Sequence, residues 1–308
     1  MFQILNVIAP LFIIIFTSAI FQKIKPVKNS YIRVLNQFAL NIGLPLLIFS
    51  SLSSTKISLY DEINLILVNS AYILILFFIV IILSKILSLN EKVFRSIIIC
   101  TMFGNVAYLG IPVLTQIFGT DVLPQVSLIV AVHIFWIFSL GIGHLEYSIT
   151  EDKSSIIPNV LKNLYRSPLL LSVILGFLFM GLQITLPSIL SNSINMITNS
   201  VTPMVLVVIG LFIGKFKLGH WKKWIPALIF SVLSLTLIPF GLYFLSLILN
   251  LDFDSLDISI LQFAMPIAIT PFALADKYNL DKDFIAKSVI ISTLLSIITL
   301  PFWVFILN

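Results

Sequence analysis

Long apolar stretches separated by short polar connections recur from one end of the chain to the other. Stretches of about 18 or more apolar residues can cross about 30 Å of hydrocarbon as α-helices. The pattern predicts an all-α integral membrane protein with ten transmembrane helices. These ten spans are expected at residues 2–22, 31–54, 63–89, 94–119, 124–148, 166–185, 187–214, 224–249, 258–279 and 283–307.

Composition agrees with this pattern and leaves no room for a soluble catalytic domain. Hydrophobic residues make up 59% of the chain and charged residues 10%, and the mean hydropathy is +1.12. A soluble domain needs more polar surface to cover its core. The net charge of +5 does not indicate nucleic-acid binding, because the basic residues are confined to particular connections between the spans.

The positions of the basic residues predict the orientation. Connections one, three, five, seven and nine, with their flanks, hold 17 of the 18 Lys and Arg residues. Basic loops stay on the cytoplasmic side of a membrane. The chain is therefore expected in a cytoplasmic (inner) membrane, with both termini outside. The even-numbered connections hold these charged residues: Lys56, Asp61, Glu62, Asp121, Asp252, Asp254 and Asp257.

The two halves of the chain resemble each other. We expect a first five-helix repeat at 1–148, a cytoplasmic linker at 149–165 and a second repeat at 166–308. Each repeat has an odd number of spans, so the second is inverted, as in many secondary transporters. Four pairs of residues recur at nearly one spacing, with offsets of 158 to 160: Pro10 and Pro168, Pro45 and Pro203, Pro112 and Pro271, and Asp121 and Asp281.

Helix-breaking residues lie near the middle of the fourth and ninth spans. Proline removes a backbone donor and glycine weakens a helix, so both spans are predicted to be broken helices that cross near the midplane. Their half-helix N-termini would hold an anion without a buried cation. The alternative is a pair of ordinary proline kinks. The residues concerned are Gly104, Asn105, Gly110 and Pro112 in the fourth span, and Pro266, Thr270 and Pro271 in the ninth.

Other polar residues carry weaker expectations. His133 lies in the middle of the fifth span, where a titratable group is a functional candidate; a histidine bonded to a neighbouring helix is the alternative. Tyr108 and Asn41 either line the site or serve packing and interhelical hydrogen bonding. Three charged residues near span ends are expected to be solvated: Glu146, Asp276 and Lys277.

The motifs of both broken spans are similar to those of the auxin efflux carrier family, which includes the plant PIN proteins. The segment from Asn105 to Pro112 resembles its Asn-x-x-x-x-Gly-Ile-Pro motif. The segment from Pro266 to Asn279 resembles its Pro-x-x-x-x-Pro-Phe-x-x-Ala-x-x-Tyr-Asn motif, which is the more specific of the two. Arg166-Ser167-Pro168 resembles its Arg-Asn-Pro, with serine in place of asparagine. The chain lacks the large plant loop, as do the shorter bacterial members.

The resemblance implies a fold like that of the bile-acid/sodium symporters. Helices three to five and eight to ten would form a transport domain. Helices one, two, six and seven would form a scaffold that is often a homodimer, and the mechanism would be of the elevator type. It also implies an organic-anion substrate such as malate, malonate or auxin. The anion's carboxylate would contact Asn105, and Pro112, Pro266 and Pro271 would shape the crossing.

Several alternatives stay open at this point. No Asp or Glu falls at the middle of any predicted span, which argues against proton coupling through an intramembrane carboxylate. Na⁺ coupling and uncoupled transport are the alternatives, the coupling ion (H⁺ or Na⁺) stays open, and no cofactor or metal is expected. An anion channel or uniporter could use the same helix ends. A non-transporting sensor is a further alternative. An enzyme is not expected, because the spans lack an acidic pair and the three histidines lack ligand-like spacing.

Overall fold

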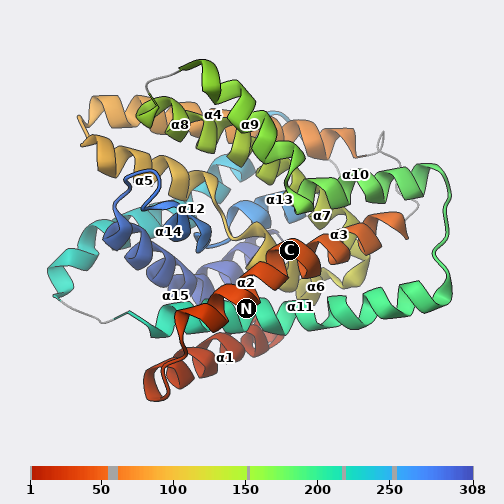
Figure 1. The fold of residues 1–308 in the computed structure, drawn as a ribbon. Coiled ribbons are helices and arrows are strands. Elements are labelled where there is room, and N and C mark those ends of the chain that lie inside the picture. The colour runs from red at the N-terminus through yellow and green to blue at the C-terminus, as the bar shows by residue number, and fades with distance from the viewer. Residues whose placement is uncertain (1, 55–61, 151–152, 217–219, 252–254, 308) are drawn as a thin grey trace. The chain divides into compact units, whose positions relative to one another are not determined.

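The structure is a computed structural model that is helical through nearly all of its described length (Figure 1). It describes residues 2–54, 62–150, 153–216, 220–251 and 255–307. Within these ranges, extended backbone pairs only at an isolated antiparallel bridge between Gly104 and Ile267. The predicted all-α class is therefore confirmed for the described residues. Five charged residues that entered the orientation argument lie outside them: Lys56, Asp61, Lys217, Asp252 and Asp254.

Most predicted spans are continuous helices. In the described part of the chain, seven helices are long and apolar enough to cross a membrane. An eighth candidate combines two helices that meet near residue 166. The multi-pass character is thus supported, whereas the count of ten and the inverted repeat stay predictions. The seven helices are Leu5–Ile24, Asn29–Ser53, Ile63–Ile86, Thr120–Ile149, Ser188–Gly214, Trp221–Ile248 and Lys282–Leu307.

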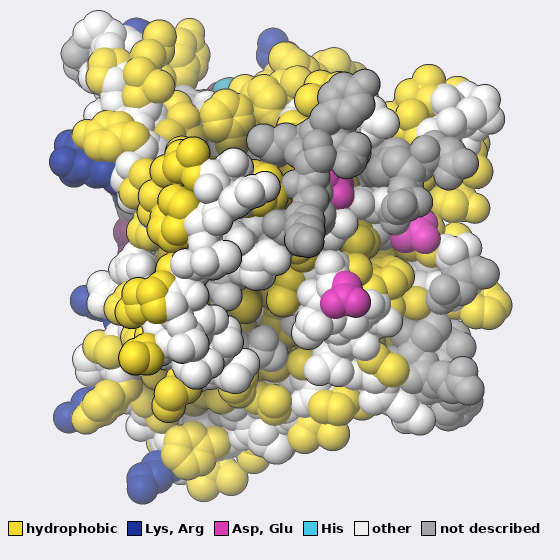
Figure 2. All heavy atoms as spheres, turned by 90° about the vertical axis from the view of Figure 1, so that its right-hand side faces the viewer, with side chains coloured by type: hydrophobic (Ala, Val, Ile, Leu, Met, Phe, Trp, Pro, Cys, Tyr) yellow, Lys and Arg dark blue, Asp and Glu magenta, His cyan; other side chains and the backbone are white. Residues whose placement is uncertain are grey.

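Large apolar side chains also cover the outside of the helices. Ile13, Phe78 and Ile298 are each more than half exposed, at 58%, 56% and 68%. Figure 2 shows a face on which hydrophobic side chains prevail over charged ones. Extensive apolar surface of this kind is unusual in soluble monomers and marks contact with a membrane or a partner. A lipid environment explains it here.

The described helices form two compact units, and each unit combines segments from both halves of the chain. Unit 1 comprises residues 1–62, 107–131 and 166–217, and unit 2 comprises 63–106, 132–165 and 218–308. A π-helical turn, Val106–Gly110, and helix α7, Leu123–Trp136, pass from one unit to the other.

Unit 1 is built on close pairs of helices. Helix α1 packs along α11, and α3 packs along α10 (Figure 1). Glycine permits the first contact, because a Cβ on Gly210 or Gly214 would meet a backbone carbonyl oxygen of α1. The elements that lie wholly in unit 1 are, in chain order, α1 (Phe2–Ile24), α2 (Asn29–Phe38), the π turn Ala39–Gly43, α3 (Leu44–Ser53), α6 (Ile111–Phe118), the 3₁₀ turn Thr120–Val122, α10 (Pro168–Gly181) and α11 (Ser188–Gly214).

Unit 2 holds both helix breaks, whereas the second part of the fourth span, from Ala107 on, belongs to unit 1. Helix α12 packs along α15. The buried Trp303 indole donates to the carbonyl oxygen of Leu235 at 2.9 Å and ties these two helices together. Its elements are α4 (Ile63–Ile86), α5 (Glu91–Met102), the π turn Ile137–Ile142, α8 (Gly143–Ile149), the 3₁₀ turn Lys153–Ser155, α9 (Ile156–Tyr165), the 3₁₀ turn Trp221–Trp224, α12 (Ile225–Ile248), α13 (Leu256–Phe263), α14 (Thr270–Leu274) and α15 (Lys282–Leu307).

Candidate functional site

The fourth predicted span is broken where its sequence indicates. Helix α5 ends at Met102, and the chain leaves the helical path through Phe103, Gly104 and Asn105. It then forms the π-helical turn and α6, with Pro112 in the first turn of α6. The π turn runs into α6 without a gap, so Pro112 lies within one helical segment, Val106–Phe118, that begins just after the break.

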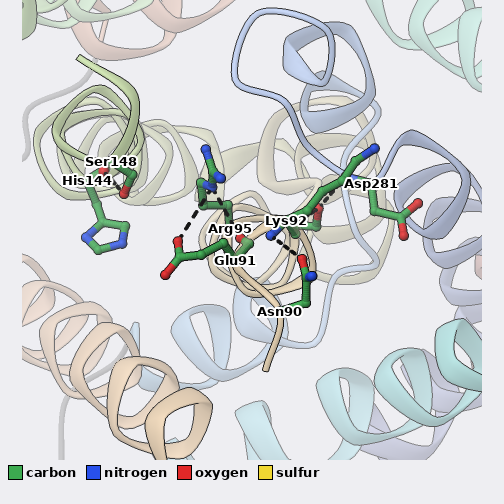
Figure 3. Close-up of polar contacts among 8 residues, drawn as sticks. Asn90, Glu91, Lys92, Arg95, His144, Ser148 and Asp281 are labelled. Atoms are coloured by element: carbon green, nitrogen blue, oxygen red, sulfur yellow. Dashed lines mark hydrogen bonds and ion pairs between the residues drawn. The ribbon is translucent and has the colours of Figure 1, made fainter. Parts of the chain in front are cut away.

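Side-chain contacts hold the start of α5 in place (Figure 3). The side-chain oxygen of Asn90 accepts a hydrogen bond from the backbone N–H of Lys92 at 2.9 Å and so caps the helix. The backbone N–H of Asp281, just before α15, donates to Ser96 Oγ at 2.7 Å. These contacts lie within unit 2, and they fix the helix that leads to the first break.

The ninth predicted span is broken in a similar way. Helix α13 ends at Phe263, residues 264–269 are not helical, and α14 begins at Thr270. Pro266 lies in the non-helical segment, and Pro271 is in the first turn of α14. Helix α14 has only five residues. It therefore carries far less of a helix dipole than the predicted half-helix would.

The two breaks are hydrogen-bonded to each other. The backbone N–H of Asn105 donates to the carbonyl oxygen of Pro266 at 2.7 Å, and the N–H of Ala268 donates to that of Phe103 at 2.9 Å. Between these bonds lies the antiparallel bridge of Gly104 and Ile267. Because backbone polar groups inside a membrane protein need partners, this pairing satisfies groups that the two helix breaks set free.

The pairing changes which groups of the breaks could bind an anion. The N–H groups of Asn105 and Ala268 are committed to the pairing, and the N–H of Ile267 donates to Ser292 Oγ at 3.1 Å. An anion at this place therefore cannot use these three backbone donors. The side-chain amide of Asn105, which is 3% exposed, is a donor in the break that the pairing does not use.

The other predicted site residues fall into both units. In unit 2, Pro271 is buried and Thr270 is half-buried, while His133 is 4% exposed with its ring centroid 4.9 Å from that of Phe263. These two residues and His133 thus belong to the same unit as the paired breaks.

In unit 1, Gly110 and Pro112 are buried, and Asn41 is exposed on the π-helical turn of the second span. Tyr108 is buried, and its hydroxyl donates to the side-chain oxygen of Asn36 at 2.7 Å. The Tyr108 hydroxyl thus has a protein partner, and whether Tyr108 also lines the substrate site stays a prediction. The partner Asn36 could not be found from the sequence, since no motif marks it.

The expectation that Glu146 is solvated is wrong. Its side chain is 9% exposed, and its carboxylate accepts from Lys277 Nζ at 2.9 Å and from the Tyr278 hydroxyl at 2.8 Å. We call these three residues the Glu146 cluster. Lys277 and Asp276 are exposed, at 59% and 79%, as expected. The cluster joins α8 to the chain just after α14.

The chemistry that the described residues offer is binding chemistry. Among them, no group of three or more His, Cys, Asp or Glu side chains could hold a metal ion. The paired breaks present an amide side chain, backbone groups and apolar side chains. Such groups can bind and orient a small ligand, but they supply neither a nucleophile with its base nor a pair of carboxylates.

Comparison with known proteins agrees with this picture. A family model described as "Membrane transport protein" matches residues 3–304. An uncharacterized transporter of Methanocaldococcus jannaschii is 25% identical over 288 residues, which is 91% of each chain. An uncharacterized transporter of Methanothermobacter thermautotrophicus is 25% identical over 278 residues, 87% of each chain. The chain is thus a transport protein and not an enzyme, and it belongs to the membrane transport protein family that includes the auxin efflux carriers.

Proposed function

We propose that the protein is a secondary active transporter of small organic anions, either dicarboxylates such as malate and malonate or auxin-like monocarboxylates. The observation that carries the proposal is the pairing of the two helix breaks beside the buried side chain of Asn105. Substrate sites of secondary transporters typically lie where discontinuous helices meet. Non-helical backbone at membrane depth is otherwise costly.

A carboxylate suits this place better than a cation does. The pairing does not use the side-chain amide of Asn105, and an amide N–H donates to a carboxylate oxygen. No Asp or Glu lies in the non-helical segments 103–105 and 264–269, so nothing there repels an anion or neutralises a cation. Gly104 and Thr270 would border the bound anion, and Pro266 and Pro271 would keep the backbone in its non-helical path.

The two compact units support an elevator mechanism. Unit 2 contains the third, eighth and tenth predicted spans and both breaks, whereas unit 1 contains the first, second, sixth and seventh. We infer that unit 2 carries the bound anion across the membrane. The proposal also includes two inverted five-helix repeats and a scaffold that forms a homodimer. It places the protein in a cytoplasmic membrane with both termini outside.

Uptake by purified protein in proteoliposomes tests the function. We would offer labelled malate, malonate and indole-3-acetate under proton, sodium and voltage gradients. We expect saturable uptake of at least one of them that is stimulated by the same anion inside. Flux that rises linearly with concentration would instead indicate a channel, and no flux from folded protein would refute the substrate class.

The site is tested by Asn105→Ala in the same assay. Loss of a hydrogen bond to a charged group costs about 1.5–3 kcal/mol, so the apparent affinity is expected to fall roughly 10–150-fold. Asn64→Ala is the matched control, because Asn64 is exposed on α4. Unchanged flux in Asn105→Ala would show that the substrate binds elsewhere, and Asn41 would be tested next.

A further inference from the structure

An apolar groove lies on the outside of unit 2, between helices α4 and α12. Helix α5 contributes Ile97 and Thr101 to its wall. The groove has a volume of about 550 Å³, within the range of about 300–1,000 Å³ that is usual for binding pockets of small molecules. Leu83 of α4 and Leu237 of α12 line it and are 49% and 58% exposed. The groove is therefore open to the surroundings of the protein, which in a membrane are lipid.

The two helices that border the groove run antiparallel. They meet at Tyr72 of α4, whose hydroxyl lies where a Cβ on Gly241 of α12 would be. Leu76, one turn further along α4, lines the same small internal cavity as Ser234, which comes earlier in α12. Residue numbers thus rise along α4 as they fall along α12. The end of α4 and the beginning of α12 therefore lie at the same end of the groove.

The wall of the groove offers an occupant almost nothing but carbon. None of the described residues that line it is charged, and only four carry a hydroxyl group. Three of these hydroxyls, those of Tyr72, Ser84 and Ser234, already donate to backbone carbonyl oxygens. A polar molecule would lose its hydration here without gaining partners. A hydrocarbon chain suits the groove instead.

Four lysines flank the groove where α4 ends and α12 begins, and we call this the basic end. Lys85 lies in the last turn of α4, and Lys92 in the first turn of α5. Lys222 and Lys223 lie in the 3₁₀ turn just before α12. Lys223 precedes Phe230, which lines the groove, by seven residues, or about 10 Å along a helix axis. All four lysines are exposed, so their flexible side chains can reach a ligand at this end.

The positive charge of the basic end is not neutralised by the protein. In the described ranges, none of the four lysines forms an ion pair, because the acidic groups of neighbouring elements have other partners. Glu91 pairs with Arg95, and Asp283 pairs with Lys287. Basic pockets between membrane helices are typical binding sites for anionic lipid head groups. An apolar groove with a basic end is complementary to a molecule with a hydrocarbon chain and an anionic head.

We propose that the groove binds an anionic glycerophospholipid of the surrounding membrane, with an acyl chain between α4 and α12 and the phosphate at the basic end. The lipid fills the space that the two helices leave between them and so stabilises unit 2. This inference goes beyond the proposed transport function, since it concerns a lipid partner and does not depend on the transported substrate.

Thermal unfolding of delipidated protein in dodecyl maltoside tests the proposal. Dioleoyl phosphatidylglycerol and dioleoyl phosphatidylcholine are titrated separately, because they share their acyl chains and differ in net charge. A ligand that binds the native state raises Tm as its concentration rises. Each lysine beside the phosphate is worth about fivefold in affinity. Phosphatidylglycerol should therefore reach half of its maximal Tm shift at a concentration at least fivefold lower, and glycerol 3-phosphate alone should give no shift.

Two variants with matched controls locate the site. Replacing the four lysines of the basic end with glutamine should abolish the preference for phosphatidylglycerol. Its control replaces four exposed basic residues of unit 1 with glutamine and should keep the preference: Lys23, Lys25, Lys28 and Arg33. Leu237→Trp fills the groove and should lose the Tm shift itself, which gives a second test if the first variant does not fold. Leu247→Trp is its control, because Leu247 is 56% exposed on the same helix but outside the groove.

Three outcomes would overturn the proposal. Equal effects of the two lipids on wild type would show that the protein does not recognise the anionic head group. An unchanged preference in the basic-end variant, or an equal loss in its unit 1 control, would show that the head group is not bound at the basic end. A shift with glycerol 3-phosphate as large as that with phosphatidylglycerol would show that the groove contributes nothing to binding.

Discussion

The pairing of the two breaks depends on a serine of α15, and removing its hydroxyl should destabilise unit 2. Ser292 is fully buried; its Oγ accepts from the N–H of Ile267 at 3.1 Å and donates to the carbonyl oxygen of Val289 at 3.2 Å. Ser292→Ala leaves the helix intact but leaves the Ile267 N–H buried without its partner. A buried N–H without an acceptor costs about 1–3 kcal/mol. The helix propensity of alanine is about 0.5 kcal/mol more favourable than that of serine, which offsets part of this cost.

The net loss of about 0.5–2.5 kcal/mol can be measured by thermal unfolding in detergent, followed by tryptophan fluorescence. For a unit of 150–250 residues, 1 kcal/mol shifts Tm by about 2–4 °C, so Ser292→Ala should unfold roughly 1–10 °C below wild type. Ser296→Ala is the control: Ser296 is equally buried on the same helix, but its hydroxyl donates only within α15, to Thr293. Equal shifts for both variants would refute the reasoning.

Two further comparisons test the packing of each unit. In unit 1, Gly210→Ala should lower Tm by several degrees, because the new Cβ would meet the carbonyl oxygen of Ile15. Overpacking of this kind costs about 1–3 kcal/mol. Gly181→Ala is the control and should unfold at the wild-type temperature, because a Cβ there would have open space around it. In unit 2, Glu146→Gln should weaken the Glu146 cluster and lower Tm by a few degrees, whereas Asp276→Asn should have no effect, since exposed ion pairs contribute little. Similar Tm values for the two substitutions would contradict the role of the cluster.

The breaks in the two spans could be predicted because their causes are local. Proline lacks an amide N–H and glycine disfavours helix, so Gly104, Pro266 and Pro271 could indicate the interruptions without knowledge of the fold. Proline alone is not sufficient, because helices continue through these prolines: Pro10, Pro112, Pro203, Pro239 and Pro301. The alternation of basic and acidic connections and the hydrophobic pattern likewise depend on neighbouring residues only. Seven of the predicted spans accordingly appear as long apolar helices.

The partners of the polar residues could not be predicted, because they depend on segments far apart in the chain. In the sequence, Glu146 has the features of a solvated residue at a helix end. In the fold, Lys277 and Tyr278 of the ninth span bind its carboxylate. Gln262 is hidden in an apolar stretch, and only the fold shows that its amide faces a cavity. The pairing of the breaks also commits backbone N–H groups that the sequence suggests for anion binding.

The central claim is that a carboxylate binds beside the paired breaks through the side chain of Asn105. Counterflow of malate, malonate and indole-3-acetate, compared between wild type and Asn105→Asp, tests it most directly. The substitution keeps the size of the side chain and replaces its donor with a negative charge, which repels an anion. The account predicts counterflow in wild type and none in Asn105→Asp protein that unfolds at the wild-type temperature. Equal counterflow in the two proteins would contradict it.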